Sequence, residues 1–136
     1  MSVTILPTNT THRILSISTP KRVMKGWGYE EVIYNGKEYC GKILHYKTDA
    51  KSSGHIHREK HESWYIASGV FDLIYIDGET GKEWHKPLSK GMTVIIPPCC
   101  YHEVKCIAEG DIFESSTPHK DEDTYRFKPG DSQNKV

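Results

Sequence analysis

The sequence is dominated by short runs of β-branched and aromatic residues that are separated by turn-forming clusters. These clusters include Asn-Gly-Lys at 35–37 and Asp-Gly-Glu-Thr-Gly-Lys at 77–82. Helical periodicity is almost absent, and many short strands at close spacing are typical of a β-sandwich or a small barrel. We therefore expect an all-β fold with strands over residues 30–35, 39–48, 53–59, 62–69, 70–77, 92–98, 102–108 and 111–117.

Length and charge limit the classes of protein that this chain can represent. Its 136 residues suffice for a single domain with one core, spanning 1–136. Lys and Arg (18) balance Asp and Glu (18), so no basic field favours nucleic acid or an anionic membrane. No apolar stretch approaches the roughly 18 residues that span a bilayer, and residues 1–13 lack a secretory pattern. We expect a cytoplasmic protein whose four cysteines are free thiols.

The spacing of histidine and glutamate residues predicts a metal site. His55 and His57 are one residue apart on an expected strand, so their side chains point to the same face. Glu62 opens the next strand-like run and His102 opens a later one. Three imidazoles and one carboxylate can hold a divalent metal, and the set suits iron, manganese, zinc or nickel. The sequence predicts one such ion and leaves its identity open.

Strand alternation allows only one of Glu62 and its neighbour His61 to point inward as the fourth ligand. Glu62, Trp64 and Ile66 share one face of their run, whereas His61 takes the other. A buried carboxylate among apolar groups is costly unless a cation pairs with it. The remaining histidines are expected outside the ligand set, with His45 on a strand beside the site and His12, His85 and His119 exposed to solvent.

The two runs that hold these residues resemble the paired motifs of the cupin superfamily. The first motif is His-x-His, three or four residues, Glu, six residues and Gly, and residues 55–69 match it, which selects Glu62 over His61. The second is Gly, five residues, Pro-x-Gly, two residues, His, three residues and Asn. Gly91, Pro97 and His102 match it. The resemblance implies a double-stranded β-helix, or jelly-roll, barrel over about 25–127, followed by a flexible C-terminal tail, 128–136.

Two cysteines depart from the second motif. Cys99 stands where the family usually has glycine, and Cys106 where it often has asparagine. Glycine tolerates backbone angles that cysteine does not, so we expect a changed turn geometry before His102. Neither departure removes a ligand.

The flanks, 25–47 and 114–127, look like small cupins related to type II mannose-6-phosphate isomerases. Those proteins carry Pro-Trp-Gly upstream, where this chain has Gly26-Trp27-Gly28, and an acidic segment ending in Tyr/Val-Arg downstream. The resemblance implies a sugar or sugar-phosphate substrate and metal-assisted aldose–ketose isomerisation. Glu114 shares a strand face with Ile112 and Ser116 and is the expected catalytic base, and Lys25 and Arg126 are expected to bind the substrate. A structural reading stays open, in which Trp27 packs on the barrel and the acidic segment is a solvated turn before a docked strand.

Other functions remain open from sequence alone. The same ligand set suits an iron-dependent dioxygenase, and a cupin can also hold a metal or metabolite without catalysis. A polar pocket with basic and acidic groups would favour the sugar substrate, and an apolar pocket the dioxygenase. We also expect a homodimer, because exposed strand edges need cover and the segment before Trp27 is long enough to cross to a partner.

Overall fold

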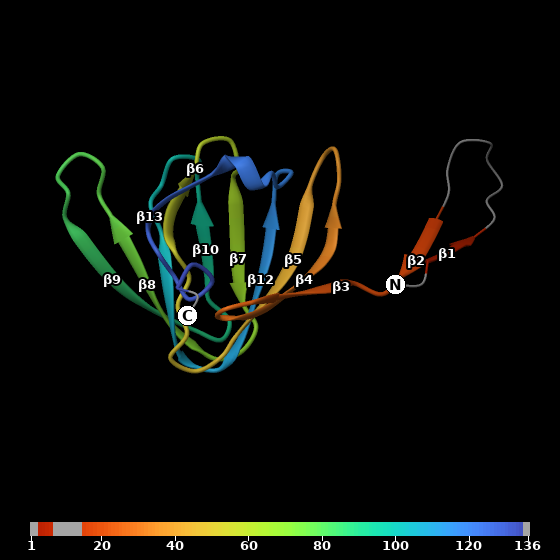
Figure 1. The fold of residues 1–136 in the computed structure, drawn as a ribbon, viewed down its shortest axis with the longest axis horizontal. Coiled ribbons are helices and arrows are strands. Elements are labelled where there is room, and N and C mark those ends of the chain that lie inside the picture. Colours follow the sequence, from red (N-terminus) through yellow and green to blue (C-terminus); the bar gives the residue numbers. More distant parts are fainter. Residues whose placement is uncertain (1–2, 7–14, 135–136) are drawn as a thin grey trace.

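The computed structural model describes residues 3–6 and 15–134. In that part of the chain the only helical element is one 3-10 turn, η1 (Asp121–Asp123). The remaining elements, drawn in Figure 1, are β1 (Val3–Leu6), β2 (Leu15–Ser18), β3 (Lys21–Lys25), β4 (Gly28–Asn35), β5 (Cys40–Tyr46), β6 (Gly54–His57), β7 (Glu62–Ile66), β8 (Val70–Ile76), β9 (Glu83–Ser89), β10 (Thr93–Ile96), β11 (Glu103–Ala108), β12 (Gly110–Ser116) and β13 (Thr124–Lys128).

Two antiparallel layers form the barrel. One layer is a six-stranded sheet with the strand order β10-β7-β12-β5-β4-β3. The other contains β11-β8-β9 and the pair β13-β6, and the bridge between His55 and His102 joins β6 to the start of β11. Strands that are distant in sequence are therefore neighbours in both layers (Figure 1). The prediction of an all-β jelly-roll barrel is confirmed.

The core lies between the layers and follows the alternation of each strand. In β7, Glu62, Trp64 and Ile66 are buried and Tyr65 is exposed, which confirms the predicted face. Trp27 is buried and its ring stacks on Tyr46 with centroids 4.3 Å apart. The remainder of the core is mostly aliphatic and aromatic: Leu44, Ala50, Phe71, Leu88, Ile96, Val104, Cys106 and Ile112.

Three barrel strands were not among those expected from the sequence. The strand β9 reads EWHKPLS, and only Leu88 in it is buried, so it lacks an apolar alternation. It pairs with β8 alone, and such an edge position tolerates Pro87. The strand β3 is also an edge strand with little burial. The third, β13, pairs with β6 and agrees with the reading of the acidic segment as a turn before a docked strand.

The chain ends differ in how they meet the barrel. Strands β1 and β2 form a two-stranded sheet of their own. Near the other end, within the expected tail, the Asp131 amide donates to the Lys51 carbonyl and the Gly26 amide donates to Ser132 Oγ. The four cysteines, all in described segments, are free thiols as expected. No helix among the described residues is long and apolar enough to cross a membrane.

Candidate metal centre

Three histidines converge where β6 meets the start of β11. His55 and His57 project from β6, and the backbones of His55 and His102 exchange two hydrogen bonds of 3.1 Å. This pairing places His102 directly opposite His55, although 47 positions separate them in the sequence. One ring nitrogen from each histidine lies within 4.8 Å of the others. The predicted histidine set is therefore brought together by strand pairing.

Hydrogen bonds to the backbone orient all three imidazoles. Nδ1 lies 3.0 Å from the Ser53 carbonyl in His55, 3.1 Å from the Asp123 carbonyl in His57 and 3.0 Å from the Cys100 carbonyl in His102. A carbonyl only accepts, so each Nδ1 carries the proton and each Nε2 keeps its lone pair. Outer partners of this kind are typical of metal-ligating histidines. The rings are held ready to ligate through Nε2.

Burial keeps these histidines neutral. It lowers the pKa of His55 to about 2, with His102 and His57 contributing, and that of His57 to about 4, with Lys60 contributing. The pKa of His102 is lowered to about 4, again mainly by burial. A metal ligand must offer an unprotonated nitrogen. All three imidazoles meet this condition at neutral pH.

The Glu62 carboxylate completes the cluster. Its Oε1 accepts a hydrogen bond of 2.7 Å from Trp64 Nε1. Its Oε2 is buried, has no hydrogen-bond partner in the described part of the chain, and lies 3.3 Å from His57 Nε2 and 3.8 Å from His102 Nε2. Burial, together with Glu114, raises the pKa of Glu62 to about 8. A buried carboxylate oxygen that faces two imidazole lone pairs is a mismatch that a cation would remove. The four residues therefore fit one metal ion.

A polar cavity of about 420 Å³ opens onto this cluster. All three residues predicted for catalysis or substrate binding, Lys25, Glu114 and Arg126, line it. Glu114 is buried on β12 with Ile112, as strand alternation predicted, whereas Lys25 and Arg126 are nearer the solvent. The cavity thus has basic and acidic groups in its wall, which is the pocket character that we associated with a sugar substrate.

Lys60 and His119 also line the cavity, and the sequence analysis did not place either of them there. Lys60 is only 4% exposed, and its Nζ lies 2.9 Å from Glu114 Oε2 and 3.3 Å from His119 Nδ1. Burial opposes the charge on Lys60, but Glu114 and Glu62 hold its pKa above the ordinary value. For Glu114, burial opposes ionisation, but Lys60 and Lys42 hold its pKa below the ordinary value. The pair is therefore an ion pair within reach of the metal ligands.

The other histidines divide as follows. His61 is exposed, so the choice of Glu62 over His61 agrees with the structure. His45 contacts Asp111 at 2.7 Å and Glu109 at 2.9 Å and does not line the cavity. His85 is exposed as expected. The expectation for His119 is wrong, because it is partly buried and lines the cavity. His12 lies outside the described residues.

Asp123 fixes the loop that follows the two histidines of β6. Its carboxylate accepts hydrogen bonds from the backbone amides of Arg58, Glu59 and Lys60, at 2.9 to 3.2 Å. These bonds end β6 at His57, before the expected limit of 59, and turn Lys60 toward the cavity. Burial alone would raise the pKa of Asp123, but the three amides lower it overall.

The turn before His102 also differs from the expectation. Cys99 has a φ of 66°, in the left-handed region that favours glycine. Its amide donates to the His57 carbonyl at 2.6 Å. The expected change of turn geometry is wrong in this respect, because cysteine adopts a glycine-like conformation. The hydrogen bond holds the strained residue in place.

Comparison with known proteins identifies the architecture. No protein-family model matches the sequence, and no curated protein matches it. The structure of oxalate decarboxylase from Bacillus subtilis at pH 4.6 matches with a TM-score of 0.68 at 16% identity, covering 79% of this chain and 30% of that one. A structure from work on the Mn(II) centres of the same enzyme gives a TM-score of 0.67, with the same identity and coverage. That enzyme belongs to the cupin superfamily.

The chain has a cupin fold. At 16% identity the likeness establishes the architecture alone, and the chain spans 30% of the length of the enzyme that it matches. Within this fold the three histidines form a group suited to one metal ion. The finer resemblance to mannose-6-phosphate isomerases finds no counterpart among these matches.

Proposed function

We propose that this cupin binds one divalent metal through His55, His57, Glu62 and His102. The observation that carries the proposal is the buried Oε2 of Glu62, which faces the histidine nitrogens and lacks a hydrogen-bond partner among the described residues. The ligand types suit iron, manganese, zinc or nickel. When bound, such an ion would polarise carbonyl and hydroxyl oxygens of a substrate.

We further propose that the substrate is a small, oxygen-rich anion, with a sugar phosphate as the leading candidate. Four basic side chains (Lys25, Lys42, Lys60 and Arg126) and four acidic ones (Glu30, Glu62, Glu114 and Asp121) line the cavity. Their formal charges cancel, so a bound divalent cation leaves a net positive cavity. Such a cavity favours an anionic ligand. Arg126, near the solvent, has the planar fork of donors that suits phosphate or carboxylate.

The reaction that fits the wall of the cavity is isomerisation or epimerisation. Glu114 is ionised by its pair with Lys60, so it can take a proton from a carbon beside a carbonyl group and return it to the adjacent carbon. The hydroxyl proton on the first carbon moves to the former carbonyl oxygen, so the substrate is rearranged without net oxidation. Lys60, 2.9 Å from Glu114, stabilises the carboxylate before the first transfer and after the second.

A second candidate is chemistry on a small carboxylate, either decarboxylation or dioxygen-dependent cleavage. Its support is the likeness in fold to oxalate decarboxylase, together with basic groups that bind carboxylate as readily as phosphate. A binding protein without catalysis would need no base beside the metal. The position of Glu114 in the cavity wall therefore supports an enzyme over a binding protein.

Metal analysis of protein purified without chelator is the first test, and about one equivalent of a transition metal is expected. The loaded protein is then incubated in D₂O with a panel of sugar phosphates and small carboxylic acids, followed by proton NMR. Isomerisation predicts deuterium at the carbon beside the carbonyl, and Glu114→Gln should abolish this exchange while metal content is retained. Glu109→Gln, at an exposed glutamate, is the matched control. Consumption of a carboxylic acid without exchange of sugar phosphates would favour the second candidate.

A further inference from the structure

The N-terminal hairpin, β1 and β2, has no strand partner in the barrel. Val3 and Ile5 pair with serines and share one face, whereas Ile17 pairs with Thr4 on the other. These three side chains and Leu15 are each more than half exposed. A two-stranded hairpin is marginally stable in water without an apolar surface to pack on. Aliphatic groups on both faces therefore need cover that the described barrel does not give.

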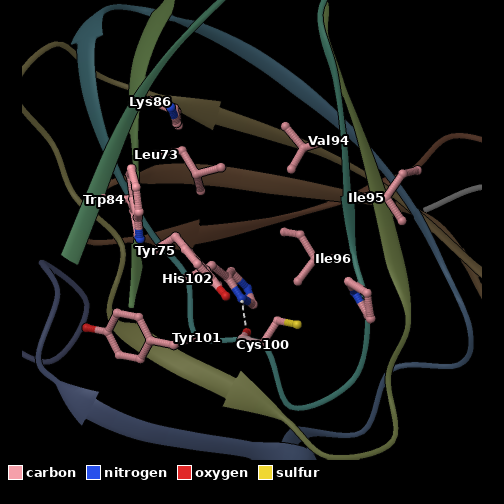
Figure 2. A pocket seen from close by; sticks show the side chains of 11 residues that line it. Leu73, Tyr75, Trp84, Lys86, Val94, Ile95, Ile96, Cys100, Tyr101 and His102 are labelled. Atoms are coloured by element: carbon pink, nitrogen blue, oxygen red, sulfur yellow. Dashed lines mark hydrogen bonds between the residues drawn. The ribbon is translucent and has the colours of Figure 1, made fainter. Parts of the chain in front are cut away.

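A second uncovered apolar surface lies at the far edge of the barrel. A cavity of about 390 Å³ opens there between β8 and β9 on one side and β10 on the other. Figure 2 shows Leu73, Tyr75 and Trp84 on one wall and Val94 and Ile96 facing them, and Ile95 is a further lining residue, on the other side of β10. We call this cavity the edge slot. Tyr75, Trp84 and Ile95 are exposed, and β10 pairs with β7 alone, so one backbone edge of β10 is also free among the described strands.

The hairpin and the edge slot are chemically matched. Residues 3–6 and 15–18 contain no charged side chain. Apart from Cys100 and His102, the slot is walled by aliphatic and aromatic groups and Pro97, and Lys86 is the one Lys or Arg among its lining residues. The Lys86 Nζ lies 5.5 Å from the centroid of the Trp84 ring, so this cation is already accommodated by an aromatic face. Contact between the hairpin and the edge slot would bury apolar surface without burying an unpaired charge.

The hairpin is badly placed to cover the slot of its own chain. β2 ends at Ser18 and β3 begins at Lys21, so the connection spans at most about 11 Å. β3 and β10 are the two opposite edges of the six-stranded sheet, five strand spacings or about 24 Å apart. In Figure 1 the hairpin lies beyond β3 and points away from β10. The occupant that remains is the hairpin of a second copy.

We propose that the N-terminal hairpin of one copy docks in the edge slot of another, with the exchange made in both directions. A mutual exchange of identical elements gives a closed two-fold dimer and leaves neither apolar surface exposed. The proposal gives the expected homodimer a defined contact, with Ile5 and Ile17 on the hairpin against Trp84 and Ile95 of the slot. It does not depend on the identity of the metal or the substrate.

The test measures the molar mass of the protein by light scattering after size exclusion. Protein concentrations from about 5 to about 100 μM are used, because dissociation of a dimer depends on concentration. The hairpin variant carries Ile5→Glu and Ile17→Glu, and the slot variant carries Trp84→Glu and Ile95→Glu. Wild type and the control Ile107→Glu, at an exposed position on β11, should be dimers. Both double variants should be monomers, with dimer Kd raised at least about 100-fold by the buried charges.

Mixing the two monomeric variants provides a sharper test. In a mixed pair, the intact hairpin of the slot variant meets the intact slot of the hairpin variant, so one contact of the two survives. Native mass spectrometry should therefore find a heterodimer in the mixture and no homodimer of either variant. Circular dichroism checks folding, and the hairpin variant alone decides if the slot variant fails to fold, because the hairpin lies outside the barrel core.

Three results would overturn the proposal. A monomeric wild type at about 100 μM would remove the dimer. A hairpin variant that remains dimeric would place the interface elsewhere. A monomeric wild type that takes up a hydrophobic dye, and loses this uptake in the slot variant, would assign the slot to a small apolar ligand instead.

Discussion

Replacing Cys99 with glycine should stabilise the protein. Cys99 has a φ of 66°, a conformation that costs a residue other than glycine about 1–2 kcal/mol. Its thiol is exposed, and its nearest polar contact is the Arg58 carbonyl at 4.0 Å, so little side-chain interaction is lost. Glycine makes the unfolded chain more flexible, which offsets roughly 0.5–1 kcal/mol of the gain. The free energy of unfolding should rise by about 0.5–1 kcal/mol.

Urea denaturation under reducing conditions, followed by tryptophan fluorescence, measures this change. For a chain of this length the gain corresponds to a rise in Tm of about 2–4 °C. Cys99→Ala is the matched control, because it removes the thiol and keeps a side chain that disfavours the positive φ. Its stability should stay within about 0.5 kcal/mol of wild type. A glycine variant no more stable than the alanine variant would refute the argument that the backbone at this turn is strained.

The remaining predictions concern the metal site and its support. His57→Ala should weaken metal retention by more than about 100-fold while the barrel stays folded, measured as metal content after dialysis, with His45→Ala as control. Asp123→Ala should cost about 3 kcal/mol, because the buried Lys60 amide and the partly buried Arg58 and Glu59 amides lose their acceptor. The pKa of Asp123 is lowered in the folded protein. The contribution of Asp123 to stability is therefore complete above the unfolded pKa of 3.8 and is lost as pH falls through the folded pKa. Urea titrations of wild type and Asp123→Ala at about pH 7 and about pH 3 should show that the difference in their free energies of unfolding shrinks at the lower pH. Arg126→Lys should weaken binding of inorganic phosphate by about tenfold in calorimetric titration, since charge is kept but the bidentate fork is lost.

The sequence was sufficient to predict residues whose positions depend on strand period. Alternation places His55 and His57 on one face of their strand, and it places Glu62 on the face that apolar partners mark as the inner one. Trp64 and Ile66 serve as those markers for Glu62. The meeting of His102 with His55 requires pairing between distant strands, and the resemblance to cupin motifs supplied what local pattern could not.

Residues in irregular segments could not be predicted in this way. Lys60 belongs to the charged run HREKHES, and such runs are usually solvated. Its burial depends on the amide bonds to Asp123 and on the ion pair with Glu114, more than 50 positions away. His119 enters the cavity for the same reason, through its contact with Lys60. Both placements arise from tertiary contacts that leave no periodic signal in the sequence.

The double role of Asp123 has a consequence for the order in which the molecule can mature. Its carbonyl sets the His57 tautomer and its carboxylate shapes the loop behind that histidine, yet it lies 66 positions downstream. During synthesis, the first histidine pair emerges from the ribosome long before the segment that orients it. A growing chain therefore exposes two of the proposed metal ligands without a finished site. Firm metal capture should coincide with the arrival of η1 and β13, so loading becomes a late event that reports closure of the barrel.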